Sequence, residues 1–389
     1  MPSLLRFKAP IVFGLFLNFF SGYGQTFFIS VFVPGFMATF ALSEAKFGTY
    51  YSALTLVSAF ILPKSSEFFE SLKWRFSGTL LLAALAVSAL LLSNADSLWI
   101  MVLAIFGLRH FGQGLSSHVS SVVIVKKVTH LRATALSIAS LGFPLSEALL
   151  PVLAAFMLTT MSWAQTWEKM FFIALGLMPF FFLLGRYLEE YKTKSNDEAE
   201  VKAVKLSFIK VIKNRQFLKY LPASICAPFF ATGIFLFQTS FSKMKGWDPN
   251  TLSIGFTAFA LTRLLFSLIG GPIIDKYKAT KVYPYLMIPM FLGMLVLGFV
   301  SSPIAGWIFM IAMGMTLGAS APLKSALWTE LFGPELHGRY RSISASFAVF
   351  STSISPILFG YLIEVGTSPQ VILSSAALAV FLSAWLAKD

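Results

Sequence analysis

The chain has 389 residues, of which 57% are hydrophobic and only 12% are charged, and its mean hydropathy is +0.77. Soluble domains carry about 25% charged residues, so the composition excludes an ordinary soluble protein and indicates a polytopic membrane protein. For that reason the net charge of +13 does not predict a nucleic-acid partner. The single Cys226 excludes an intrachain disulfide. We predict no cleaved signal peptide, because the N-terminus runs into an apolar span without a small-residue cleavage site.

Twelve apolar runs of about 20 residues each are long enough to cross a bilayer. None of them alternates polar and apolar residues as a membrane barrel strand does. The sequence therefore predicts an all-α membrane protein with twelve transmembrane helices. The predicted spans are 10–38, 47–63, 76–93, 98–125, 132–158, 168–187, 217–241, 251–274, 282–301, 304–329, 341–363 and 369–387.

The distribution of basic residues predicts the orientation of these spans. With the N-terminus in the cytoplasm, 23 of the 30 Lys and Arg residues lie on the cytoplasmic side, four lie on the other side and three lie within spans. We therefore expect a protein of a bacterial-type inner membrane with both termini in the cytoplasm.

A charged stretch divides the spans six and six. It predicts an N-terminal half, 1–188, a cytoplasmic linker, 189–215, and a C-terminal half, 216–389. Residues 204–215 of the linker have apolar residues at helical spacing with basic ones between, which fits a helix on the inner membrane surface and equally a plain tether.

Two pairs of similar segments suggest that the halves are repeats. Arg132-Ala-Thr-Ala-Leu-Ser137 opens span 5 and Arg339-Tyr-Arg-Ser-Ile-Ser344 opens span 11, 207 residues later. The loop after span 2 holds Pro63-Lys-Ser-Ser-Glu67, and 208 residues later the loop after span 8 holds Gly271-Pro-Ile-Ile-Asp275. The nearly equal offsets indicate a duplicated six-helix unit.

This organisation resembles the major facilitator superfamily. Gly271-Pro-Ile-Ile-Asp-Lys276 is similar to the Gly-x-x-x-Asp-Arg/Lys loop signature of that family, although its later Gly and paired Arg are replaced here by Lys278-Ala-Thr-Lys281. The resemblance implies that spans 1, 4, 7 and 10 line a central cavity and that the halves rock around it. It also implies gating roles for Gly271, Asp275, Lys276, Arg132 and Arg339.

Four charged residues lie well inside predicted spans, namely Arg109, Glu147, Arg263 and Lys324. A charge in that position is costly, so each is a functional hypothesis. On an ideal α-helix, Arg109 shares a polar face with Gln113, Ser116 and Ser120, and His110 flanks that face. His118 falls on the opposite side, where we predict a packed histidine.

Three interior cations, Arg109, Arg263 and Lys324, stand against the single carboxylate of Glu147, which predicts an anion site. Gln113, on the polar face of Arg109, is a further substrate-binding candidate. Arg263 lies 12 residues before Asp275, which is roughly 18 Å from the inner surface on a helix. An arginine in span 8 also resembles the monocarboxylate and oxalate branches of the superfamily, where it pairs with a substrate carboxylate. Lys324 corresponds to Ser117 by the 207-residue offset. The alternatives are an ion pair of Arg263 with Glu147 and extension of Lys324 to the inner surface.

Glu147 and His110 are the predicted proton carriers, because burial brings the pKa of a carboxylate towards neutrality and histidine titrates near pH 7. A salt bridge between Glu147 and Arg109 is the structural alternative. Polar residues of spans 1 and 7 are further substrate-binding candidates. They are Asn18, Tyr23 and Gln25 in span 1 and Gln238 in span 7.

These observations predict a proton-coupled secondary transporter of a small organic anion, with symport favoured because the proton offsets the anion's charge. We expect a monomer without a cofactor. No nucleotide-binding, metal-binding or catalytic motif predicts an enzyme or an ATP-driven pump. The alternatives are a proton-driven exporter of amphipathic compounds and, from another class, a channel or a membrane receptor that does not transport.

Overall fold

The computed structural model describes residues 8–128, 132–190 and 207–388, and every regular element in these ranges is a helix. Eleven helical segments in the described chain are long and apolar enough to cross a membrane. The predicted all-α membrane fold is confirmed. Predicted span 47–63 corresponds to α3 (Glu44–Ser71), which has the length of a span but is not among the eleven, because Ser, Thr and Tyr residues interrupt its apolar stretch.

The described residues form two compact units. Unit 1 holds the residues up to Leu42 and those from Ala53 to Glu190, and unit 2 holds Ser43–Ser52 and residues 207–388. Before α3, the chain forms α1 (Lys8–Phe20), the 3-10 segment η2 (Ser21–Gly24) and α2 (Thr26–Thr39). The rest of unit 1 consists of α4 (Trp74–Ser93), α5 (Leu98–Gly107), the π-helical segment η3 (Leu108–Ser116), α6 (Ser117–Lys127), α7 (Arg132–Ser140), α8 (Gly142–Met157) and α9 (Trp163–Glu190).

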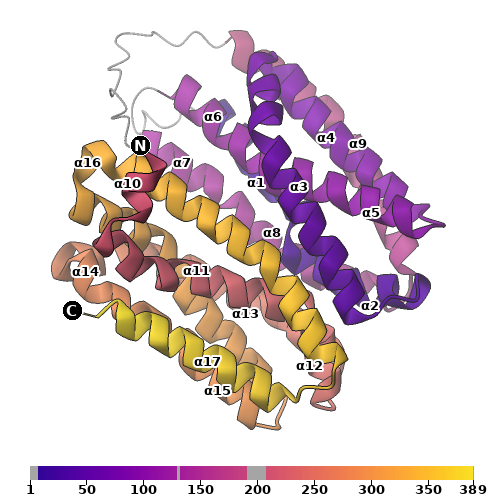
Figure 1. Ribbon diagram of the computed structural model, residues 1–389. Coiled ribbons are helices and arrows are strands. Elements are labelled where there is room, and N and C mark those ends of the chain that lie inside the picture. The colour runs from indigo at the N-terminus through magenta and orange to yellow at the C-terminus, as the bar shows by residue number, and fades with distance from the viewer. Residues whose placement is uncertain (1–7, 129–131, 191–206, 389) are drawn as a thin grey trace. The chain divides into compact units, whose positions relative to one another are not determined.

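Close helix packing organises unit 1. Helices α4 and α9 lie side by side (Figure 1), and a Cβ atom at Gly185 of α9 would lie 2.4 Å from the Cα of Arg75 in α4. Helix α1 packs against α6, α7 and α8. Small residues at such crossings let helix backbones approach closely, which is how membrane helices gain packing energy in the absence of a hydrophobic driving force.

Unit 2 is also built from closely packed helices. Its elements are α10 (Phe208–Ile212), α11 (Arg215–Leu236), α12 (Gln238–Met244), α13 (Thr251–Tyr277), α14 (Ala279–Val282), the 3-10 segment η4 (Tyr283–Met287), α15 (Ile288–Phe299), α16 (Ile304–Glu364) and α17 (Pro369–Leu386). Most of the predicted linker lies outside the described residues, and α10 is the described part of its predicted amphipathic helix.

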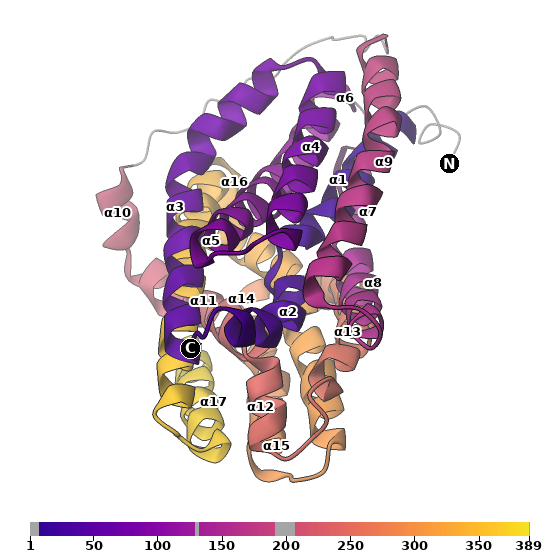
Figure 2. The ribbon, with the colours of Figure 1, turned by 90° about the vertical axis from the view of Figure 1, so that its right-hand side faces the viewer.

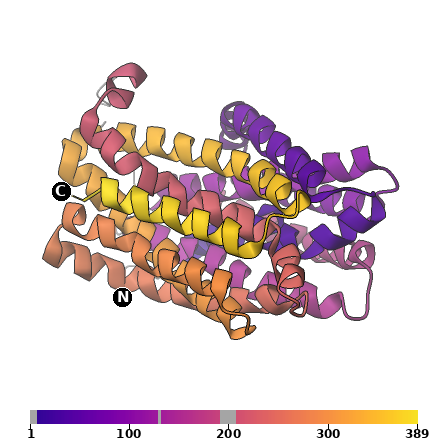
Figure 3. The ribbon, with the colours of Figure 1, turned by 60° about the horizontal axis from the view of Figure 1, so that its bottom comes forward.

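Helix α16 supplies two spans. Gly333 interrupts it with φ 76° and ψ 164°, a conformation that an L residue rarely adopts, and the two arms form the spans Ile304–Gly333 and Glu335–Glu364. The arms of α16 pack against α13, α11 and α15, and α17 runs beside α15 (Figure 3). Gly314 and Gly318 face the backbone of α13 at Phe259–Arg263, where a Cβ atom would lie 2.3–2.6 Å from carbonyl oxygens.

The helices around the two predicted loop motifs are longer than expected. Residues Pro63–Glu67 lie inside α3, which is one continuous helix to Ser71 (Figure 2), and the backbone of Gly271–Asp275 belongs to α13. The prediction that these motifs form loops is wrong. Hydropathy marks where a helix leaves the hydrocarbon core, whereas polar residues with adequate helix propensity continue the helix into water.

The start of α3 belongs to unit 2. Within that unit the hydroxyl of Ser240 donates to the Glu44 carboxylate at 3.3 Å, and the backbone N–H of Ala45 donates to Glu364 at 3.0 Å. A Cβ atom at Gly360 would lie 2.4 Å from the carbonyl oxygen of Glu44. Polar contacts and close backbone packing thus hold this segment.

Candidate substrate and proton sites

Two irregular helix segments meet in unit 1 where the predicted polar stripe lies. A Cβ atom at Gly24 of η2 would lie 2.0 Å from the carbonyl oxygen of Leu108 and 2.8 Å from the backbone nitrogen of Gln113, both in η3. Gly112 faces Gly24 from the other side, with 2.8 Å between its added Cβ and the Gly24 nitrogen. The two segments cross with their backbones in close contact, and π-helical turns such as η3 occur frequently at functional sites.

Arg109 ties this crossing together. Its side chain is 2% exposed, and its Nη1 donates to the carbonyl oxygen of Gly24 at 3.1 Å and to Thr26 Oγ1 at 3.5 Å. The carbonyl is available because the chain is extended at Gln25, between η2 and α2. In this structure Arg109 therefore orients the break in span 1, a positioning role beside its predicted role in substrate binding.

His110 is enclosed between hydroxyl groups of α3. Its Nδ1 lies 3.1 Å from Ser58 Oγ, its Nε2 lies 2.9 Å from Ser65 Oγ, and its ring stacks on Phe106. Because Ser65 donates its own proton to the carbonyl oxygen of Ile61, its oxygen accepts from Nε2–H. Nδ1 is then the atom that gains or loses a proton, and the Ser58 hydroxyl can donate to it or accept from it.

The prediction that His118 is a packed histidine is wrong. Its Nε2 lies 2.7 Å from Oε1 of Glu70, and Lys126 lies 3.4 Å from the other oxygen of the same carboxylate. The hydrogen bond from His118 lowers the pKa of Glu70, and Lys126 adds to this effect. The π-helical turn between His110 and His118 changes the angular spacing assumed for an α-helix, so both rings face α3.

Residues of the predicted polar face of span 4 contact different elements, because the π-helical turn changes their angular spacing. Ser116 donates to the carbonyl oxygen of Phe111, five residues back, whereas Ser120 donates to Gly14 of α1. Gln113 is half-buried in η3. The assumption of one continuous polar face along span 4 is therefore wrong.

The polar candidates of span 1 are buried within unit 1. Asn18 donates to Ser120 Oγ at 2.7 Å and to the carbonyl oxygen of Ala139 at 3.0 Å, which ties α1 to α6 and α7. Tyr23 donates to Met170 at 3.4 Å and its ring packs with Trp167. Gln25 is buried at the break itself. In this structure Asn18 and Tyr23 connect helices.

Glu147 lies in α8 and is 2% exposed. Its neighbour Ser146 packs on η2, since a Cβ atom at Gly22 would lie 2.7 Å from Ser146 Oγ. Helix α8 therefore contacts the same short segment that Arg109 binds from η3. The structure places Glu147 in the same unit as Arg109, its predicted salt-bridge partner, and as His110, the other predicted proton carrier.

In unit 2, Lys324 binds a carbonyl oxygen that the sequence leaves open. Its ammonium group donates to the carbonyl oxygen of Ser224 in α11 at 2.5 Å. Proline has no N–H, so Pro228 cannot donate to Ser224, four residues before it. Lys324 occupies this position instead of extending to the membrane surface, which was the alternative interpretation. Among the described residues no carboxylate lies within 4 Å of its Nζ.

Arg263 is half-buried in α13, with its guanidinium carbon 5.9 Å from the centre of the Phe259 ring. Gly314 and Gly318 bring α16 against the Arg263 backbone. The same two helices of unit 2 thus carry Arg263 and Lys324. Gln238, the candidate of span 7, is fully buried at the start of α12.

Among the predicted gating residues, the structure describes the side chains of Lys276 and Arg339. Lys276 is exposed and its ammonium lies 5.0 Å from the centre of the Tyr277 ring, and Arg339 is exposed in the second arm of α16. For Gly271, Asp275 and Arg132, the structure describes only the backbone.

Sequence reasoning missed Ser224, Ser58, Ser65 and Glu70 as partners of the buried charged and titratable groups. A proline four residues after Ser224 is a signal that could have identified an open carbonyl. Nothing in one sequence pairs Ser58 or Ser65 with His110, because these contacts depend on how α3 packs.

Comparison with known proteins supplies the family. The family model of the Major Facilitator Superfamily matches residues 13–248 and 241–389. An uncharacterized protein of Mycoplasma pneumoniae is 33% identical over 60 residues, which are 15% of this chain. The match spans 45% of the length of that curated relative.

Solved structures share the fold at low sequence identity. A D-xylose-proton symporter is 16% identical with a TM-score of 0.72, covering 98% of this chain and 97% of that chain. The nucleoside transporter NupG is 14% identical with a TM-score of 0.70, covering 99% and 98%. A bacterial homolog of the human lysosomal transporter Spinster is 14% identical with a TM-score of 0.66, covering 99% and 94%.

The two matched ranges together cover most of the chain, including residues of both units. The chain belongs to the Major Facilitator Superfamily and is a multi-pass membrane transporter.

Proposed function

We propose that this protein is a proton-coupled secondary transporter that takes up a small organic anion. The observation that carries the proposal is Lys324, a cation in a spanning helix whose neighbour is a backbone carbonyl rather than a carboxylate. A carbonyl dipole orients the ammonium group but leaves its charge uncompensated, and an uncompensated charge in a membrane is costly. An anionic substrate would supply the missing charge.

Arg263 would provide the second contact to the substrate. A guanidinium group donates two parallel hydrogen bonds to a carboxylate, and its position on α13 beside α16 supports a shared site with Lys324. A carboxylate substrate, as in the monocarboxylate and oxalate branches, fits these two cations. Gln238, in the same unit, would add a neutral hydrogen bond. In unit 1, Arg109 would hold the helix break at Gly24.

His110 would carry the proton. Its two hydroxyl neighbours keep hydrogen bonds in either protonation state, because a serine hydroxyl both donates and accepts. Gain of a proton therefore leaves no buried polar atom without a partner, whose cost is about 1–3 kcal/mol. Glu147 is the second carrier, placed on α8 against the segment that Arg109 binds. One proton would offset one negative charge, which favours symport.

The proposal includes a bacterial-type inner membrane, cytoplasmic termini and a monomeric transporter, as the basic loops and the two repeats predict. It also includes the two halves 1–188 and 216–389 as the moving parts, with gating by Gly271, Asp275, Lys276, Arg132 and Arg339.

Uptake by proteoliposomes tests the substrate class. Wild type, Lys324→Gln and the control Lys243→Gln, an exposed lysine of α12, would be given a panel of radiolabelled carboxylates with and without an inward proton gradient. We expect gradient-driven uptake of one acid that is lost in Lys324→Gln and kept in Lys243→Gln. Proton-coupled movement of a lipophilic dye with no uptake of any acid would contradict the proposal and favour an exporter of amphipathic compounds.

A further inference from the structure

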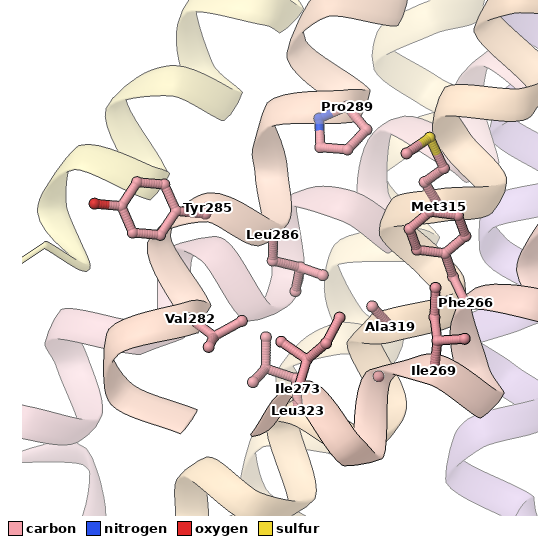
Figure 4. Close-up of a pocket in the computed structure, with 11 residues that line it drawn as sticks. Phe266, Ile269, Ile273, Val282, Tyr285, Leu286, Pro289, Met315, Ala319 and Leu323 are labelled. Atoms are coloured by element: carbon pink, nitrogen blue, oxygen red, sulfur yellow. The ribbon is translucent and has the colours of Figure 1, made fainter. Parts of the chain in front are cut away.

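An apolar groove opens on the surface of unit 2 between α13, α15 and α16. It encloses about 150 Å³, and its walls include Phe266, Ile273, Leu286, Met315 and Leu323 (Figure 4). The side chain of Ile273 is 42% exposed, so the groove is open on its outer side. In a membrane protein, such an apolar surface faces lipid.

A basic recess adjoins this groove. It encloses about 520 Å³ and is lined in part by Tyr277, Lys281 and Lys388. Val282 and Tyr285 line both hollows, so the recess and the groove adjoin at these residues, and we call the two together the depression. The Tyr285 hydroxyl points away from the groove (Figure 4), which leaves the groove apolar.

The dimensions of the depression fit one leaflet of a bilayer. Phe266 and Tyr277 are eleven residues apart on α13, which is about 16 Å along a helix. Half of the hydrocarbon core of a bilayer is about 15 Å. With the recess at the level of the headgroups, the groove extends to about the middle of the membrane.

The charged residues among the described lining of the recess are both lysines. Lys281 and Lys388 are exposed, and in the described chain no carboxylate lies within 4 Å of either ammonium group. The neighbouring Glu330 accepts from the backbone N–H of Ala279 at 2.8 Å and from Thr280 Oγ1 at 2.6 Å. Its carboxylate therefore holds the start of α14, and the two lysines remain available to an anion.

We propose that this depression binds one anionic phospholipid, with the phosphate between Lys281 and Lys388 and one acyl chain in the groove of Phe266, Ile273 and Met315. Basic pockets between membrane helices recognise anionic headgroups in this way. The shared Val282 and Tyr285 would lie at the junction of headgroup and chain. The occupant is a lipid rather than a soluble anion, because the apolar groove begins where the recess ends.

Native mass spectrometry of the full-length protein tests both parts of the site. Phosphatidylglycerol and phosphatidylcholine with the same acyl chains would be titrated onto wild type and the double variant Lys281→Gln/Lys388→Gln. Wild type should bind phosphatidylglycerol more tightly. The double variant should lose roughly thirty-fold in affinity for phosphatidylglycerol and much less for phosphatidylcholine, whose choline cation offsets the charge of the phosphate. The matched control Lys213→Gln/Lys243→Gln removes two exposed lysines elsewhere in unit 2 and should bind like wild type.

A second pair of variants tests the groove. Ile273→Trp fills it, whereas Leu268→Trp adds the same ring at a 65% exposed position of α13 outside it. Only Ile273→Trp should weaken binding of both lipids. Equal affinity of wild type and the double lysine variant for phosphatidylglycerol would overturn the proposal. So would displacement of phosphatidylglycerol by glycerol phosphate at comparable affinity, since that result would identify a pocket for soluble anions.

Discussion

Arg109 and Lys324 are stabilised by the same means, although they lie in different units. Each donates to a backbone carbonyl that a helix break leaves without its usual partner, Gly24 before an extended residue and Ser224 before a proline. Hydrogen bonds from charged groups contribute about 1.5–3 kcal/mol. Buried cations at such positions stabilise irregular helix segments. Under the proposed function, Lys324 would in addition carry positive charge for the substrate.

Arg109 and Arg263 should differ in role, because Arg109 is buried at a helix crossing and Arg263 is half-buried. Arg109→Gln should lower the melting temperature in detergent and abolish uptake, because it removes the hydrogen bond to Gly24 in the interior of unit 1. Arg263→Gln should abolish uptake with little change in melting temperature, because Arg263 is only half-buried. Equal loss of thermal stability in both variants would contradict the separation of positioning from substrate binding.

The stability of the protein should depend on pH through Glu70. It follows predicted span 47–63 on α3, and His118 and Lys126 hold its pKa below the ordinary value of 4.5. A lowered pKa in the folded state means that the ionised carboxylate stabilises the fold above pH 4.5 and that this stabilisation disappears as the pH falls through the lower folded pKa.

Glu70→Gln should therefore be less stable than wild type at pH 6 by up to about 1 kcal/mol, as for a pair near the surface, and the two proteins should converge below pH 4. Thermal unfolding across this pH range measures the difference. A gap that widens on acidification would refute the assigned role of Glu70.

At the scale of elements, the crossing of η2 with η3 determines the shape of unit 1. Its close approach depends on glycine, since the nearest atoms to an added Cβ at Gly24 belong to backbone that cannot rotate aside. Gly24→Ala should destabilise the protein by about 1–3 kcal/mol and reduce uptake. Gly176→Ala in α9, where nothing lies within 4 Å, is the matched control and should be neutral or slightly stabilising. Unfolding and uptake of both variants would be compared with wild type.

The helices themselves could be predicted from the sequence because hydropathy and length are local properties. The π-helical turn in span 4 could not; it lies where Gly112 packs against Gly24, a residue far away in the sequence. An assumption of regular α-helix then misplaced His118, whose ring faces Glu70. Likewise, the charge of Lys324 is visible in the sequence, but its contact with Ser224 joins residues 100 positions apart.

At the scale of the whole molecule, family membership identifies a membrane transporter, and the described buried charges underlie the proposal for what it moves. Coupling requires that the anion and the proton travel together, because secondary transport is a linkage between two binding events. The proposal assigns the anion to unit 2 and the proton to unit 1. Each half would then bind one of the two coupled ligands.

Proton movement driven by the anion alone tests most directly whether anion transport is coupled to protons. Proteoliposomes with a pH-sensitive dye inside and equal pH on both sides would receive the acid identified by uptake. We expect internal acidification with wild type and none with Lys324→Gln. His110→Ala should bind the anion without acidification. Anion uptake by wild type with no change in internal pH would contradict proton coupling.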